Sequence, residues 1–194
     1  EIVRDGTGEP TGWLKEHAWL AFEDLLPKPT DAELRAALGV AILEANRLGI
    51  SRVQSAGLDD EMVPLLAEML AADGLTLRFT LSSIVNPDAD PQAVIDRVAS
   101  WRNTLDPDFL DARVIKFFLD GVLESHTGYM PDGYADRPEE VGTCLWTVPA
   151  YRDAVRLAQQ NGFQVWTHAI GTGAIAMALD AYQADGAHSK TLRP

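Results

Sequence analysis

Cysteine and basic residues are scarce in this sequence, and each shortage excludes a class of protein. A single cysteine, Cys144, occurs among 194 residues, so no disulfide can form within the chain and nothing favours a secreted, disulfide-stapled domain. The 16 Lys and Arg residues face 29 Asp and Glu residues, which gives a formal net charge of −13. Because nucleic acids and anionic membranes attract basic surfaces, neither is an expected partner.

Long apolar runs and a nucleotide-binding glycine pattern are also missing. No hydrophobic stretch reaches the length of about 20 residues that a membrane helix needs, and the polar, acidic start is unlike a signal peptide. We therefore expect a cytoplasmic protein. Gly171-Thr172-Gly173 follows a predicted strand but lacks the third glycine of a dinucleotide fingerprint. Hydrophobic residues nevertheless make up 46% of the chain, which predicts a folded core.

The pattern of residues divides the chain into a segment over residues 1–29 and a longer segment over residues 30–194. Short apolar stretches on either side of a turn-rich run at residues 5–10 predict a β-hairpin in the first segment. Thr30 and Glu33 have the spacing of a capping box, which predicts that a helix begins there.

From Thr30 onward, helical patterns alternate with short apolar strands, and this order is typical of parallel strands with right-handed crossovers. The predicted fold class is α/β. Four such units fit half of a (β/α)₈ barrel or a small open doubly wound sheet. Residues 120–148 form a long loop, and loops of this length inside a compact domain are usually lids or binding loops.

Lys116 lies inside an apolar strand predicted over residues 113–119. In a parallel sheet both faces of a strand are buried, so this amine cannot simply extend into water. One interpretation is an amine near the strand end that reaches water or pairs with Asp120. Another is a nucleophile with a lowered pKa that forms a Schiff base. In a third, the amine takes up carbon dioxide, and the resulting carbamate bridges two divalent metal ions.

His168 is the last polar residue of a second apolar strand and precedes a glycine turn into a helix. The structural alternative is a core histidine that bonds one backbone carbonyl. However, imidazole is the commonest metal ligand in proteins, and barrel enzymes hold their active sites at the carboxyl ends of the strands. We therefore expect Lys116 and His168 to share a pocket at one rim of the sheet.

Three polar residues of the long loop are candidates for substrate binding: Asp120, Ser125 and His126. Their alternative is a set of contacts with one another inside the loop. None of them is assigned a catalytic role.

At these residues the chain resembles the amidohydrolase superfamily, specifically amidohydrolase family 3. The shared features, in chain order, are the opening Glu1-Ile2-Val3-Arg4-Asp5…Gly8-Glu9-Pro10-Thr11-Gly12, the strand Lys116-Phe117-Phe118-Leu119-Asp120-Gly121, the loop Glu124-Ser125-His126-Thr127 and the turn His168-Ala169-Ile170-Gly171. They run over nearly the whole chain.

The resemblance implies a (β/α)₈ barrel that holds one or two divalent metal ions, usually zinc, and hydrolyses C–N bonds of small amide-like substrates. It also implies that Lys116 is the ligand from the fourth strand, carbamylated and bridging, and that His168 is the ligand from the fifth strand. The metal ions would lower the pKa of a bound water and polarise the scissile carbonyl.

The chain departs from the family pattern at several points. It contains no His-x-His pair, and it lacks the later Glu-His strand and the aspartate of the eighth strand. Thr172-Gly173 stands where family members often have Asp-Arg. We therefore expect an internal fragment, approximately units 2 to 5 of a barrel, that is inactive by itself.

Two further functions are consistent with the residues. The first is a barrel-type Schiff-base lyase or aldolase that uses Lys116. The second is a non-enzymatic α/β module that associates through its open sheet edges, and a homo-oligomer is compatible with either hypothesis.

Overall fold

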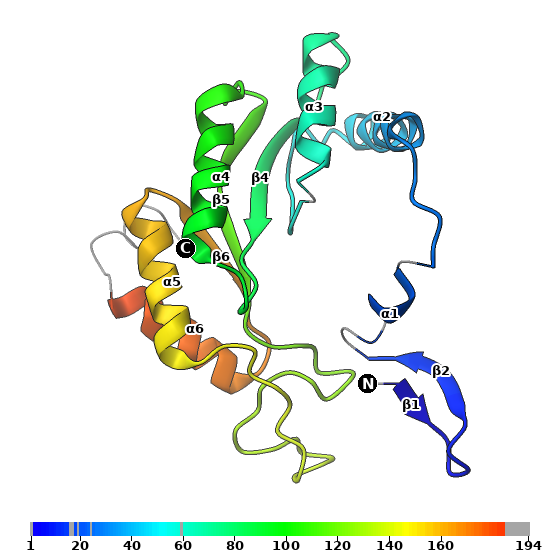
Figure 1. Ribbon diagram of the computed structural model, residues 1–194, viewed down its shortest axis with the longest axis vertical. Coiled ribbons are helices and arrows are strands. Elements are labelled where there is room, and N and C mark those ends of the chain that lie inside the picture. The colour runs from blue at the N-terminus through cyan, green and yellow to red at the C-terminus, as the bar shows by residue number, and fades with distance from the viewer. Residues whose placement is uncertain (1, 16–17, 19, 24, 59, 185–194) are drawn as a thin grey trace.

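Strands and helices alternate along most of the chain. The computed structural model describes residues 2–15, 18, 20–23, 25–58 and 60–184 (Figure 1). The elements in chain order are β1 (Ile2–Arg4), β2 (Pro10–Leu14), α1 (Leu20–Glu23), α2 (Asp31–Arg47), β3 (Arg52–Gln54), α3 (Met62–Ala71), β4 (Arg78–Ile84), α4 (Pro91–Thr104), β5 (Leu110–Phe118), α5 (Val148–Gln160), β6 (Gln164–His168) and α6 (Thr172–Ala184).

The predicted hairpin is confirmed by the antiparallel pairing of β1 with β2, in which Ile2 lies opposite Leu14. The Asp5 carboxylate shapes the turn between the strands, because its Oδ1 accepts bonds from the Thr7 amide at 2.8 Å and the Thr7 hydroxyl at 2.7 Å. The division of the chain at residues 29 and 30 stays a prediction.

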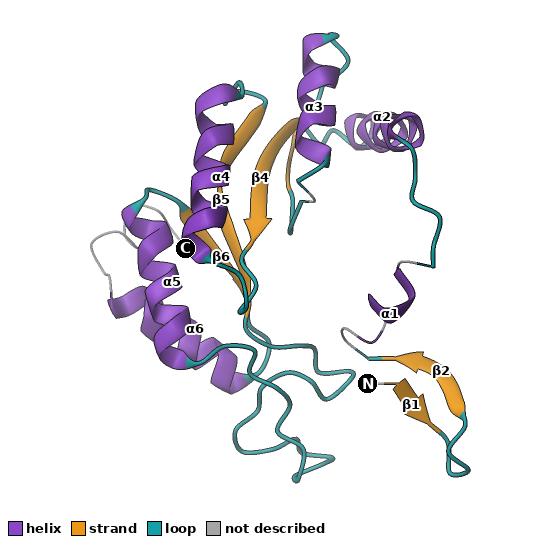
Figure 2. Ribbon diagram, in the orientation of Figure 1, coloured by secondary structure: helices purple, strands orange, loops and turns teal. Residues whose placement is uncertain are grey.

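The second sheet has four strands in the order β3-β4-β5-β6, and every neighbouring pair is parallel. Each strand is followed by a helix, as right-handed crossovers require. Helices α4, α5 and α6 pack along one face of the sheet, which curls as half of a barrel does (Figure 2). The prediction of an α/β fold built from parallel βα units of a barrel is confirmed.

The hydrophobic core lies between the sheet and these helices. Ile115 and Phe117 of β5 are fully buried there. The Phe117 ring makes edge contacts with Trp146 at 5.6 Å and with Tyr151 at 5.5 Å between ring centroids. Because side chains alternate along a strand, Lys116 points to the opposite face, away from this core.

The capping box at the start of α2 is confirmed. The Glu33 amide donates to Thr30 Oγ1 at 3.3 Å, and Glu33 Oε2 accepts from the Thr30 amide at 2.8 Å. Gly49, at φ 75°, follows the end of the same helix, where the left-handed conformation favours glycine. Among the described residues, no helix has the length and apolar character needed to cross a membrane.

Phe117→Ala tests whether the aromatic cluster carries the stability of the core. We expect the free energy of unfolding to fall by about 3–5 kcal/mol, because the substitution leaves a cavity among Phe117's buried neighbours. Phe22→Ala is the matched control, since Phe22 is 43% exposed and its loss is expected to cost less than about 0.5 kcal/mol. Urea unfolding followed by circular dichroism measures both values, and equal losses would contradict this account of the core.

Candidate metal and substrate site

Lys116 is a buried cation that contacts aromatic rings. Its residue is only 4% exposed, and its Nζ lies 4.5 Å from the ring centroid of Phe118 and 4.9 Å from that of Trp166. Among the residues that the structure describes, no carboxylate lies within ion-pair distance of this amine, so the expected alternative of a pair with Asp120 is not found. Burial lowers the pKa of Lys116 below its usual range.

His168 ends β6, and its imidazole is oriented by the backbone. Nε2 lies 2.9 Å from the Gly121 carbonyl oxygen and 3.9 Å from Asp120 Oδ1. A carbonyl oxygen only accepts hydrogen bonds, so Nε2 carries the hydrogen, and in the neutral ring Nδ1 keeps the lone pair. Nδ1 is therefore the nitrogen that can bind a metal ion.

The structure brings Lys116 and His168 to the same face of the sheet. Lys116 is registered with Trp166, and His168 follows two residues later with Phe118 as its partner. The Phe118 ring centroid lies 4.5 Å from the Lys116 amine and 5.2 Å from the His168 ring centroid. The sum of these distances limits the separation of amine and imidazole to about 10 Å, within reach of a two-metal centre with ions about 4 Å apart. Metal binding by the two residues stays a prediction.

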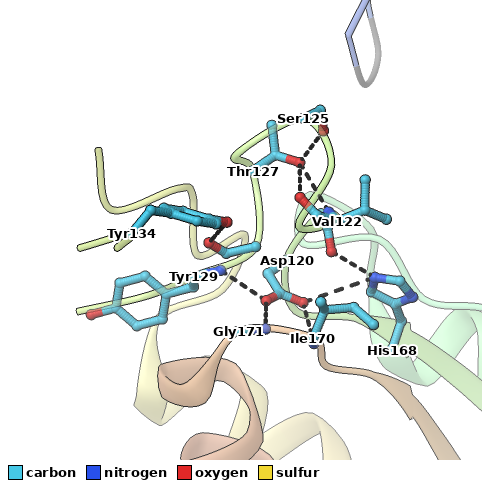
Figure 3. A network of polar contacts seen from close by, with 11 residues as sticks. Asp120, Val122, Ser125, Thr127, Tyr129, Tyr134, His168, Ile170 and Gly171 are labelled. Carbon is cyan, nitrogen blue, oxygen red and sulfur yellow. Dashed lines mark hydrogen bonds and ion pairs between the residues drawn. The ribbon is translucent and has the colours of Figure 1, made fainter. Parts of the chain in front are cut away.

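Asp120 lies at the start of the long loop, and its side chain is fully buried. Its carboxylate accepts hydrogen bonds from three backbone amides, those of Tyr129 at 2.8 Å, Ile170 at 3.0 Å and Gly171 at 2.7 Å (Figure 3). The last two amides lie at the N-terminus of α6, where the helix dipole favours an anion. Asp120 thus joins the loop to α6, while its contact with a substrate stays a prediction.

Two glycines let the loop lie directly on the N-terminus of α6. A Cβ at Gly171 would collide with the backbone of Tyr129, and one at Gly173 would lie 2.6 Å from Tyr129 Cδ1 and 2.7 Å from Pro131 Cγ. The Tyr129 carbonyl accepts a bond from the Gly173 amide at 3.0 Å. The departure from the family's Asp-Arg therefore coincides with a loop that caps the helix through its own backbone.

The other two loop candidates have partners inside the loop. The Ser125 and Thr127 hydroxyls lie 2.8 Å apart. His126 Nε2 lies 2.9 Å from Asp136 Oδ2, and this hydrogen bond is the main reason why the pKa of Asp136 is lowered. His126 also has a φ of 56°, an uncommon conformation for a residue with a side chain. Substrate binding by Ser125 and His126 stays a prediction.

No group of three or more His, Cys, Asp or Glu side chains that could hold a metal ion occurs in the described part of the chain. Lys116 and His168 therefore supply an incomplete ligand set by themselves. Of the two rings that contact Lys116, sequence reasoning missed that of Trp166. The period-two pattern puts Phe118 on the same face, but Trp166 becomes its neighbour only through the register of β5 with β6.

Asp120→Ala tests the role of this carboxylate in stability. The substitution leaves three amides without an acceptor in a buried place, so we expect the free energy of unfolding to fall by at least about 3 kcal/mol. Asp120→Asn keeps one accepting oxygen and is expected to lose less, with faster hydrogen exchange at residues 129, 170 and 171. Asp88→Asn, at an exposed position, is the control. Unchanged hydrogen exchange at these three residues in Asp120→Asn would contradict the conclusion that Asp120 joins the loop to α6.

Comparison with known proteins shows which proteins this chain is related to. The protein YtcJ of Bacillus subtilis (strain 168), named as an amidohydrolase, is 28% identical over 185 residues, which are 94% of this chain and 34% of YtcJ. The chain thus spans about a third of that relative's length.

Two solved structures share the fold. An uncharacterized metal-dependent hydrolase from Pyrococcus horikoshii OT3 superposes with a TM-score of 0.72 and 22% identity, over 94% of this chain and 36% of that one. A second, from Pyrococcus furiosus, gives a TM-score of 0.69 and 21% identity, over 86% of this chain and 34% of that one. The sequence profile of the amidohydrolase family matches residues 1–192. This match covers nearly the whole sequence and confirms the resemblance, and the chain therefore belongs to the amidohydrolase family.

Proposed function

We propose that the natural protein carrying this chain is a metal-dependent hydrolase of amide-like C–N bonds, with Lys116 and His168 as two of its metal ligands. The observation that carries the proposal is the Lys116 amine, which lies buried on the same face as His168 and has no carboxylate within ion-pair distance among the described residues. A buried cation of this kind is costly unless it is neutralised or modified. Family membership supports the same reaction class.

The surroundings of Lys116 suit conversion to a carbamate. Burial lowers the pKa of this amine, so a larger fraction is neutral and can add to carbon dioxide, forming an N–C bond and releasing one proton. The product is an anion with two oxygens that can bind metal. Because the rings of Phe118 and Trp166 attract the ammonium form, we expect the carbamate to accumulate only together with metal cations that neutralise it.

The surroundings of His168 suit a metal ligand as well. Ligating histidines usually donate their second ring N–H to a carbonyl or carboxylate, which is the bond that His168 makes with Gly121. One nitrogen and carbamate oxygens suit zinc. When bound, a zinc ion supplies an activated water and polarises the scissile carbonyl. We further propose a cytoplasmic protein that acts on a small amide, without nucleic acid or membrane partners, and that is compatible with a homo-oligomer.

Lys116→Ala and His168→Ala in the natural protein test the ligand assignment. Each is expected to lower the bound metal, measured by plasma emission spectrometry, and to reduce kcat/KM for simple amides by at least about 100-fold, because a metal ligand is lost. Added formate or acetate is expected to restore part of the metal content in Lys116→Ala but not in His168→Ala. Lys15→Ala, in the segment that follows the hairpin, is the control.

Full metal content and activity in Lys116→Ala would overturn the assignment. The isolated chain gives a second check in equilibrium dialysis, where it is expected to bind zinc weakly and to hydrolyse no amide, since two ligands do not close a zinc site. Chelator-sensitive amide hydrolysis by the isolated chain would contradict that expectation.

A Schiff-base enzyme is the second candidate, and the buried amine with its lowered pKa is the observation that favours it. In that reaction the Lys116 nitrogen would form an imine with a carbonyl substrate and release water. Borohydride would reduce the imine to a stable amine, which mass spectrometry locates. With a panel of small aldehydes and ketones we expect no adduct specific to Lys116. A trapped imine at Lys116, together with an activity that survives chelators, would replace the hydrolase proposal.

A further inference from the structure

A hollow of about 730 Å³ lies at the carboxyl ends of β3 and β4, beside the candidate metal site. The connector between α1 and α2 forms one wall of this hollow, and the loop between β3 and α3 forms another. Its size is that of a small-molecule pocket. Half of the residues that line it are apolar, and these include Leu26, Leu34, Leu58, Met62 and Ile84.

The hollow begins one strand away from Lys116. Ile84, which lines it, is the registered partner of Lys116 on the neighbouring strand, so both side chains point to the same face. Adjacent strands lie about 4.8 Å apart. A substrate whose scissile bond lies near Lys116 can therefore extend a substituent past Ile84 into the hollow.

The wall beside Ile84 is held in place by the backbone. Gly57 has a φ of 144°, and a Cβ added there would lie 2.5 Å from Ile84 Cδ1. The next residue, Leu58, donates its amide to the Ser82 carbonyl at 3.0 Å. The loop after β3 is thus fixed against β4, which gives the hollow a preformed wall.

The charges around the hollow disfavour an anionic ligand. Arg97 is paired with Asp60, at 2.8 Å between Nε and Oδ2, and also donates to Ser83 Oγ at 3.1 Å. Of the other charged side chains in the lining, Glu23 and Glu61 are acidic and Lys28 is basic.

From the position, lining and charge of this hollow, we propose that it receives an uncharged, apolar substituent of the amide substrate, such as an alkyl or aryl group. The inference rests on the proposed function and deepens it, because it names a substrate class for the same site.

The test uses the N-methylamides of acetic, butanoic and hexanoic acid, with binding to the Lys116→Ala variant of the natural protein measured by isothermal titration calorimetry. Binding of the same three amides to metal-stripped wild-type protein is the second measurement. Each added methylene is expected to tighten binding about threefold to fourfold as it leaves water. Leu26→Asp should weaken binding of the hexanoic amide about tenfold. Leu25→Asp, at the neighbouring residue that is 77% exposed and outside the lining, should change it less than twofold.

Equal affinity for the three amides, or equal weakening by the two aspartate variants, would overturn the assignment of the hollow. The outcomes also separate this inference from the proposed function. Graded binding without hydrolysis of any amide by the wild-type protein supports the hollow and removes the hydrolase proposal. Hydrolysis without graded binding would overturn only the assignment of the hollow and leave the hydrolase proposal standing.

Discussion

The carboxylate of Asp120 holds together the parts of the structure on which the candidate site depends. It accepts hydrogen bonds from one amide of the long loop and from two amides at the start of α6, and its own residue lies two positions after the end of β5. Its neighbour Gly121 orients the His168 ring through the carbonyl oxygen. The end of β5, the end of β6 and the loop are therefore positioned by one buried anion, and the loop is anchored at its base.

Lys116 shows the opposite arrangement, a buried cation with no ion-paired carboxylate in the part of the chain that the structure describes. Aromatic faces give it partial compensation, but they do not replace a carboxylate. Such an amine costs folding free energy, and this cost is a reason to look for chemistry at the site. Ile84, the registered partner of Lys116, lines the neighbouring hollow, which in the proposed function would select among substrates.

The sequence predicted what depends on local patterns. The capping box of Thr30, the alternation along β5 and the order of strands and helices are local signals, and they led to the parallel sheet and to Lys116 and His168 on one face. The hydrogen bonds by which Asp120 joins the loop to α6 could not be predicted, because two of its partners lie 50 and 51 residues away in the sequence. The contact of Trp166 with Lys116 likewise depends on strand register, which no local pattern determines.

The closeness of Tyr129 to Gly173 has an evolutionary consequence. A relative that carries arginine at the position of Gly173 has no room for side chains placed as those of Tyr129 and Pro131 are, so its loop must carry other residues there or leave α6 by another route. The glycine and the loop are therefore expected to be inherited together. Grafting this loop alone onto such a relative would place the Tyr129 ring and the arginine side chain in the same space.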